Sequence, residues 1–366
     1  MPLPLIIGAA ALVAASYGAK KGYDGYQKHS EADDIVKRAK AAYDERRTVF
    51  DAQEKKTEVA LTALGNLELE IGESFGEFKT LADTLINDLN ANSQDKLEVK
   101  FPKRELQKIE NYSYSAVGVL GSIAGAGAAG AAAGFAVYGG VMALGAASTG
   151  TAISALAGAA ATNATLAAIG GGSLAAGGLG MAGGTAILGA AVAAPILAIA
   201  GWAYDNHGEE ALKNAHKASD EADAAIKKLG KADEFLADTE EYARRIKRAL
   251  TRIYREFHCY FDDLKDVSAL VDDLKGRNVD VAAELAKLGT SVTQIIENGY
   301  ALASILTKVI TTPLFKVKEA RGAILVDENG LPEMLKDADG SMMLNGDKID
   351  DVLDAAKQDA TRYEHR

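Results

Sequence analysis

The sequence predicts an all-α protein, an extended helical bundle or coiled coil with an inserted, uncharged Gly/Ala-rich hairpin. Two observations predict this fold. Apolar residues recur every seven positions over two long stretches that are otherwise rich in charge, which is the pattern of helices paired along a seam. Between these stretches, residues 111–204 contain no Asp, Glu, Lys, Arg or His, in a chain of 366 residues that is 25% charged.

The bulk composition argues against several classes of function. The formal net charge of −11 argues against nucleic-acid binding, because phosphate contacts need a surface rich in Lys and Arg. The single cysteine, Cys259, excludes an intrachain disulfide, and with five scattered histidines it argues against a structural zinc site. No nucleophile, base and orienting group form a recognisable catalytic set. We therefore expect no enzyme, no cofactor, no metal and no small-molecule substrate.

Residues 1–27 form an N-terminal apolar anchor or signal segment. The run from Leu3 to Gly18 is uncharged and is followed by Lys20 and Lys21. It is about 16 residues long, which is short for a spanning helix, since a span needs about 20. A signal peptide is one alternative, although no basic residue precedes the apolar run. A short membrane anchor, or an apolar helix tucked against the rest of the chain, fits better.

Residues 28–110 contain the first long helix and a turn. The helix is predicted from His29 to about Asn92, and residues 90–102 have the composition of a turn or break. A second heptad row holds Leu61, Phe75, Ala82 and Leu89. The first row contains Val36, Tyr43, Phe50 and Thr57, followed by the predicted coiled-coil seam residues Leu64, Ile71, Phe78 and Leu85.

Residues 205–316 contain further coiled-coil helices. Two apolar rows, three residues apart, run from Glu210 to Lys275, and their first positions are alanines that allow close approach of a partner helix. A third helix runs from about Leu285 to Val309, and Pro313 ends or bends it. In the longer of these helices, the predicted seam residues are Leu229, Leu236, Leu250, Phe257 and Leu264.

Residues 317–366 form a small acidic C-terminal module. Residues 323–326 are a short β-like run, and residues 327–330 and 337–340 have the composition of turns. A last helix is expected from about Lys348.

The uncharged segment, residues 111–204, is predicted to insert into a membrane. Surface that faces water normally carries charge every few residues, so an uncharged segment is either buried or in lipid. Burying all of it among helices whose apolar seams are narrow is geometrically hard, so we expect lipid. Glycines spaced four residues apart let helices pack closely in lipid, and the predicted contact residues are Gly121, Gly125, Gly130, Gly134, Gly180 and Gly184.

The flanks of this segment predict its topology. Tyr112 and Tyr114 at one end, and Trp202 and Tyr204 at the other, are predicted interfacial aromatics. If the helices on either side pair, the number of spans is even. Basic residues near both ends mark one side as cytoplasmic, so we expect a membrane protein with cytoplasmic helices. The alternative is a protein secreted in a soluble form that inserts later. The basic residues are Lys20, Lys21, Lys103, Arg104, Lys108, Lys213 and Lys217.

The order of long helix, uncharged segment and long helix resembles the α-helical pore-forming toxins of the cytolysin A and haemolysin BL type. It also resembles the apolipoprotein L-like proteins. Residues 148–178, from Ser148-Thr149-Gly150 to Gly177-Gly178, are similar to the Gly/Ala-rich core of the small interferon-inducible membrane proteins. These resemblances concern architecture and composition. They imply action at a membrane and no roles for particular residues.

Two motif-like patterns are rejected. The glycines of one GxGxxG string, Gly125 to Gly130, have no acidic residue where a dinucleotide ribose needs one, and neither this string nor Gly178 to Gly183 lies in a βαβ alternation. Asp337 and Asp339 do not begin a calcium loop, because Met342 stands in place of the required glycine and Lys348 in place of the bidentate Glu.

These observations predict a membrane-inserting, oligomerising helical protein that permeabilises or remodels a bilayer through a hairpin of close-packed glycines. The expected partners are the lipid bilayer and further copies of the chain. The alternative is a resident membrane-anchored coiled-coil scaffold, which would recruit partners without forming a pore.

Overall fold

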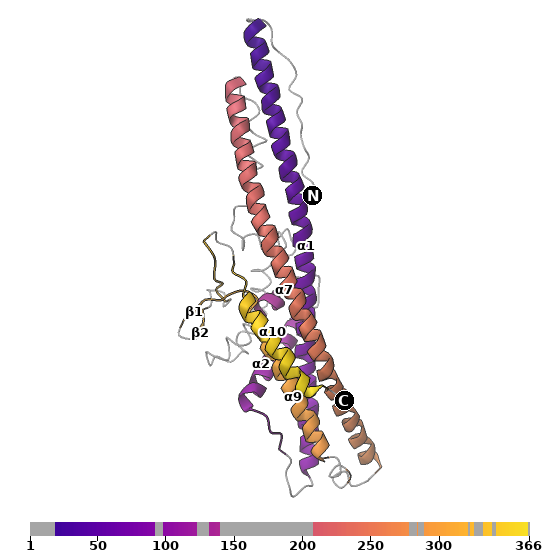
Figure 1. Cartoon of the computed structure of the whole chain (residues 1–366). Coiled ribbons are helices and arrows are strands. Elements are labelled where there is room, and N and C mark those ends of the chain that lie inside the picture. Colours follow the sequence, from indigo (N-terminus) through magenta and orange to yellow (C-terminus); the bar gives the residue numbers. More distant parts are fainter. Residues whose placement is uncertain are drawn as a thin grey trace. The chain divides into compact units, whose positions relative to one another are not determined.

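The protein is all-α, as predicted. The structure is a computed structural model that describes residues 19–91, 98–122, 132–139, 208–277, 284, 289–320, 323–325, 332–338 and 342–364. Two helices dominate the described residues, α1 with 73 residues and α7 with 69 (Figure 1). The helical elements are α1 (Ala19–Ala91), α2 (Lys103–Ser122), η1 (Phe135–Gly139), α7 (Gly208–Gly276), α9 (Gly289–Ile310), α10 (Gly346–Ala360) and η5 (Thr361–Tyr363).

The chain divides into two compact units, and each unit contains part of both long helices. The described residues of the first unit are 19–50 of α1 and 208–231 of α7. The second unit contains the remaining described residues. The predicted segments 28–110 and 205–316 each contribute residues to both units, and the domain boundaries predicted from composition stay predictions.

In the first unit, small residues bring the two helices together. Ala32, Ile35 and Ala215 are buried in one cluster, and Arg46 donates a hydrogen bond from Nη2 to the carbonyl of Gly230 over 3.5 Å. The contact between residues 32–35 and 215 lies earlier on both helices than the contact between 46 and 230. The helices are therefore parallel here. The alanines predicted to permit close approach are all buried: Ala215, Ala218, Ala222 and Ala225.

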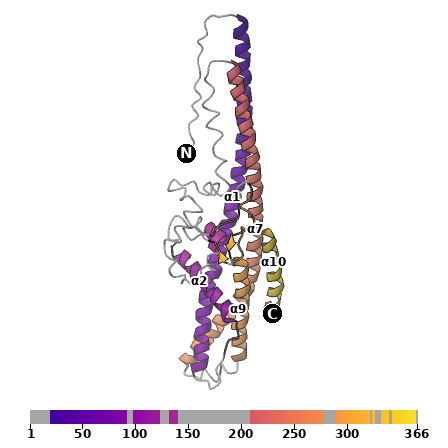
Figure 2. The ribbon, with the colours of Figure 1, turned by 90° about the vertical axis from the view of Figure 1, so that its left-hand side faces the viewer.

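In the second unit the two helices also run parallel (Figure 2). Thr57 Oγ1 donates to the carbonyl of Leu236 over 2.9 Å, and the hydroxyls of Ser74 and Tyr254 lie 2.7 Å apart. Further along, Lys275 forms an ion pair with Asp88. The next described helix after α1 is α2, which runs antiparallel to it.

The predicted seam residues are buried within the chain. Seven of the nine lie in one core cluster with Phe75 of α1 and Val292 of α9. The other two, Leu229 and Leu236, are buried outside that cluster. A role for them in contact with another subunit stays a prediction. The nine residues are Leu64, Ile71, Phe78, Leu85, Leu229, Leu236, Leu250, Phe257 and Leu264.

The C-terminal residues pack into the core of the second unit. The helix predicted after Lys275 is α9, which ends at Ile310, shortly before Pro313; residues 285–288 lie outside the described residues. The predicted β-like run contains β2 (Ala323–Ile324), which pairs antiparallel with β1 (Glu319–Ala320). From this C-terminal part, the same core cluster as α1 and α7 receives Leu314, Phe315, Met334, Met342, Ile349, Ala356 and Ala360.

Candidate functional site

One face of α1 is lined by glycines, and the beginning of the uncharged segment lies on it. Gly65, Gly72 and Gly76 are spaced seven and four residues apart, which places them on one side of a helix. A Cβ atom on Gly65 would collide with the backbone carbonyl of Ala132, and one on Gly72 with Cβ of Ala116. The close approach therefore requires glycine at these two positions.

The inner side of α2 packs antiparallel on this glycine face. Glu110 pairs with Lys79 at 3.5 Å. A Cβ atom on Gly76 would lie 2.8 Å from Oγ of Ser113, and Ala116 reaches back to Gly72. As the residue number rises on α2, it falls on α1. Glycines on α1 and small side chains on α2 allow the two helices to lie close together.

Tyr112 is the large side chain of this contact, and it is fully buried. Its hydroxyl donates a hydrogen bond to the backbone carbonyl of Glu68 over 2.8 Å. Its ring lies 6.2 Å from Phe75 of α1 and 5.9 Å from Phe135 of η1, measured between ring centroids. Tyr112, on α2, therefore contacts both α1 and the π-helix η1.

Residues 132–137 belong to the protein core. Ala132, Ala133, Phe135 and Val137 are buried in the cluster that also holds the paired long helices. These residues and the inner side of α2 are therefore packed on the protein here, and insertion of the whole uncharged segment into lipid stays a prediction. Glycine at positions 65 and 72 of α1 leaves room for the small residues Ala132 and Ala116. Deleting residues 116–203 would consequently uncover part of the core.

From Asn111 onward α2 carries no charge, and several residues on its outer side are exposed. Tyr114 is 56% exposed and Val117 is 49% exposed. Nothing within 4 Å would meet a Cβ atom on Gly118 or Gly121. These residues follow each other along one side of the helix at spacings of three and four. The second half of α2 thus presents surface of the kind that a bilayer accepts.

Glu68 lies at the centre of the glycine face. It is three residues after Gly65 and four before Gly72, so it points to the same side of α1. Its side chain is buried at 3% exposure, and its Oε2 atom has no hydrogen-bond partner among the described residues. Burial raises the pKa of the Glu68 carboxyl well above its ordinary range. Burial also raises the pKa of the Tyr112 hydroxyl, and the negative charge of the nearby Glu68 carboxylate raises this pKa further.

The structure describes some of the predicted membrane residues. Gly121 is exposed and Gly134 is buried. Of the aromatics, Tyr112 lies in the core and Tyr114 on the surface. The helix contacts in lipid and the aromatic belt stay predictions. The remaining residues lie outside the described part of the chain: Gly125, Gly130, Gly180, Gly184, Trp202 and Tyr204.

In the part of the chain that the structure describes, no helix combines the length and apolarity needed to cross a bilayer. The described residues contain no group of three or more His, Cys, Asp or Glu side chains that could hold a metal ion. Cys259 is partly buried, and burial together with the neighbouring Glu256 raises the pKa of its thiol. A raised pKa disfavours the reactive thiolate.

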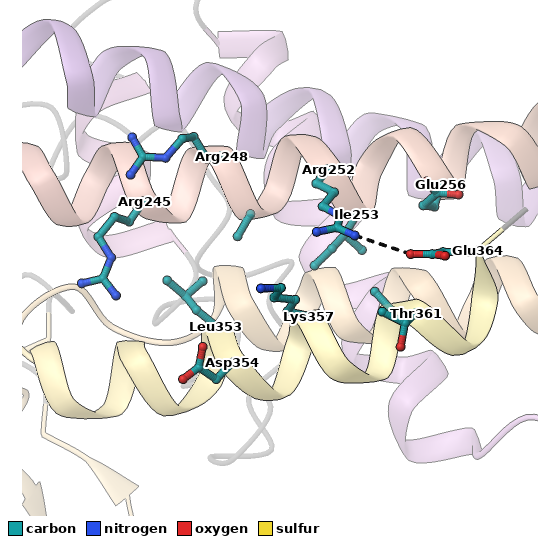
Figure 3. A pocket seen from close by; sticks show the side chains of 12 residues that line it. Arg245, Arg248, Arg252, Ile253, Glu256, Leu353, Asp354, Lys357, Thr361 and Glu364 are labelled. Carbon is teal, nitrogen blue, oxygen red and sulfur yellow. Dashed lines mark hydrogen bonds and ion pairs between the residues drawn. The ribbon is translucent and has the colours of Figure 1, made fainter.

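A surface pocket of about 360 Å³ lies between α7 and α10 (Figure 3). Arg245 contacts Asp350 beside it, and Arg252 contacts Glu364 at 3.4 Å. Four basic and three acidic side chains line it, and none of the lining residues is Ser, Cys or His. Both signs of charge line this pocket, and the ion pairs of Arg245 with Asp350 and of Arg252 with Glu364 link α7 to the C-terminal residues.

Sequence reasoning missed Glu68 and the glycine face, although a signal was present. The second heptad row of α1 runs through positions 61, 75, 82 and 89, and position 68 of that row is occupied by Glu68. A carboxyl in a row of apolar residues marks a position where burial costs free energy.

Comparison with known proteins finds no protein-family model, no curated protein and no solved structure that matches this chain.

Proposed function

We propose that the protein inserts into membranes, and that its helical bundle holds the start of the inserting segment on the glycine face of α1. In the inserted form, several copies assemble and permeabilise or remodel the bilayer. The observation that carries the proposal is the contact itself. The uncharged segment of 94 residues begins on the glycine face of α1. There, Gly65 and Gly72 leave room for the backbone of Ala132 and for Cβ of Ala116.

The packing on the glycine face supports release of the segment from α1. A glycine contributes no side-chain area to an interface, whereas an aromatic side chain buries about 150–250 Å². On the glycine face, Tyr112 and Phe135 are the only aromatic side chains that the described part of the segment buries. The rest of its buried surface there is small. A contact of this kind holds a segment in place at a modest free-energy cost of separation.

The exposed side of α2 supports contact with lipid. Lys103, Arg104 and Lys108 occupy the first half of the helix, and the second half from Asn111 carries no charge. Basic residues followed by tyrosine and then by apolar residues are typical of a helix that enters a bilayer from its polar surface. Tyr114 and Val117 are exposed where such an entry would begin.

The test separates membrane binding from permeabilisation. Purified protein is mixed with liposomes that contain anionic lipid, and binding is measured by flotation while leakage is measured by dye release. We expect the wild type to do both. Replacing Gly125 and Gly130 with Leu should preserve binding, because the segment becomes more apolar, and should reduce dye release, because helices in lipid lose close backbone contact.

A matched control replaces Ala128 and Ala129 with Leu, which adds similar apolar volume and keeps both glycines. This variant should bind and release dye like the wild type. If the wild type binds liposomes but releases no dye at any lipid ratio, the pore is wrong and the resident scaffold takes its place. If it does not bind, the membrane proposal is wrong.

A further inference from the structure

We propose that the protonation state of Glu68 controls whether α2 and residues 132–137 stay docked on α1. We call this control the Glu68 catch. A neutral carboxyl is compatible with α2 and residues 132–137 lying over it, whereas ionisation favours their departure from α1. This inference rests on the proposed function for its biological purpose. Its physical content concerns docking alone, which is measurable without a membrane.

The geometry places Glu68 beneath the docked elements. Gly65, on one side of it, touches the backbone of Ala132, and Gly72, on the other side, touches Ala116 of α2. The hydroxyl of Tyr112 bonds to the backbone carbonyl of Glu68 itself. When α2 and residues 132–137 are in place, the carboxyl is covered. When they leave, it faces water.

The surroundings offer the carboxylate no compensation. From α2, the titratable group that faces it is Tyr112, whose hydroxyl is already donated to the carbonyl. The buried residues of the segment 132–137 are alanine, glycine, phenylalanine and valine. On α7, the hydroxyl of Tyr254 is engaged by Ser74 and Glu70 of α1. No cation among the described residues pairs with Glu68, and a buried carboxylate without a partner is strongly disfavoured.

The direction of the pH dependence follows from the raised pKa of Glu68 in the docked state. An undocked, solvated carboxyl has its ordinary pKa of about 4.5. Below that pH the carboxyl is neutral in both states, so docking is fully stable. As the pH rises toward the raised value, only the undocked state loses the proton, so docking weakens. For one proton, the docking constant falls by at most about tenfold per pH unit.

Hydrogen exchange tests this without lipid. Protection factors, that is exchange rates divided by those of an unfolded peptide at the same pH, are measured for the amides of residues 109–116 between pH 5 and pH 9. In the wild type they should fall with rising pH, by up to about tenfold per unit. In Glu68→Gln they should stay constant and exceed those of the wild type at pH 9.

Two variants make the result decisive. Glu73→Gln removes an exposed carboxyl from the same helix and should keep the pH dependence of the wild type. Glu68→Met replaces the carboxyl by an apolar side chain of similar length and should behave like Glu68→Gln. A pH dependence that persists in both neutral variants would overturn the proposal. So would loss of the fold in both, because a neutral side chain must favour the docked state.

The outcome is independent of membrane activity. If Glu68→Gln abolishes the pH dependence while no form of the protein binds liposomes, the catch stands and the proposed membrane function falls. If liposomes are permeabilised equally at pH 5 and pH 9 and docking shows no pH dependence, the membrane function stands and the catch is wrong.

Discussion

Two faces of α1 meet neighbouring helices by opposite means. On the face toward α7, Phe75 and Phe78 pack against Phe257 with ring centroids 5.5 and 5.2 Å apart. On the face toward α2, Gly65 and Gly72 leave room for backbone and alanine. Large side chains pack together in the first contact. In the second, the absence of side chains at Gly65 and Gly72 lets the neighbouring segment approach α1 closely.

This difference indicates which contact persists and which one opens. Separating the aromatic side chains of α1 and α7 exposes several large rings and leaves cavities behind, whereas lifting α2 from the glycine face exposes one large ring, that of Tyr112, beside small side chains. The catch at Glu68 also lies on the glycine face. We therefore expect the α1–α7 pair, called the frame below, to persist and the α1–α2 contact to open. The predictions below test this contrast, from the largest expected effect to the smallest.

Removing a central aromatic side chain should unfold the frame. Phe257 is fully buried between Phe75 and Phe78. We expect Phe257→Ala to lower the free energy of unfolding by about 3–5 kcal/mol, the cost of a large cavity. Urea denaturation followed by circular dichroism measures it. A loss as small as that of an exposed residue would mean that this face is not the permanent one.

Adding a single methyl group to the glycine face should loosen α2 and leave the frame intact. Gly72→Ala places a Cβ atom against Cβ of Ala116 and near the Tyr112 ring. We expect a loss of about 1–3 kcal/mol from overpacking, with faster hydrogen exchange in α2.

Gly118→Ala is the matched control, because its Cβ atom would meet nothing within 4 Å. It should be neutral or stabilise α2 by up to about 1 kcal/mol, since alanine favours helix over glycine. Equal exchange in the two variants would show that the close approach at Gly72 is unimportant.

Removing one hydroxyl should weaken the movable contact slightly. Tyr112→Phe keeps the ring and loses the hydrogen bond to the carbonyl of Glu68. The expected loss is about 0.5–1.5 kcal/mol, again seen as faster exchange in α2. An unchanged exchange rate would show that the ring alone holds α2.

Breaking an exposed ion pair should have the smallest effect. The side chains of Arg252 and Glu364 are 58% and 53% exposed. We expect Arg252→Ala to cost between about 0 and 1 kcal/mol, because solvent screens such pairs. A larger loss in urea denaturation would mean that the pocket between α7 and α10 contributes to the frame.

The frame was predictable from the sequence, because its signal is periodic. The heptad rows through Leu64 and Phe257 place apolar residues on one side of each helix, and those residues are buried. The relative direction of the two helices was not predictable, since parallel and antiparallel pairs share the same spacing. Only contacts such as Thr57 with Leu236 show that they run parallel.

The glycine face was harder to predict for a physical reason. Glycine is common in flexible and in closely packed positions alike, and Gly65 and Gly72 lie in a helix whose other rows are strongly charged. Their meaning depends on Ala116 and Ala132, which are distant in the chain. Glu68 was the local signal, because it interrupts an apolar row.

A reversible crosslink tests most directly whether the segment must leave α1. A Cβ atom on Gly76 would lie 2.8 Å from the Oγ position of Ser113, close to the roughly 3 Å that a disulfide needs between Cβ and the partner sulfur. The double variant Gly76→Cys and Ser113→Cys, in a Cys259→Ser background, should therefore form a disulfide between α1 and α2. Each single cysteine variant is a control.

The measurement is dye release from liposomes by the oxidised double variant, before and after reduction. The account predicts little release while the disulfide holds α2 on the glycine face, and release at the level of the single variants once it is reduced. Equal release from the oxidised and the reduced protein would contradict the account, because the membrane-active form would then keep α2 docked on α1.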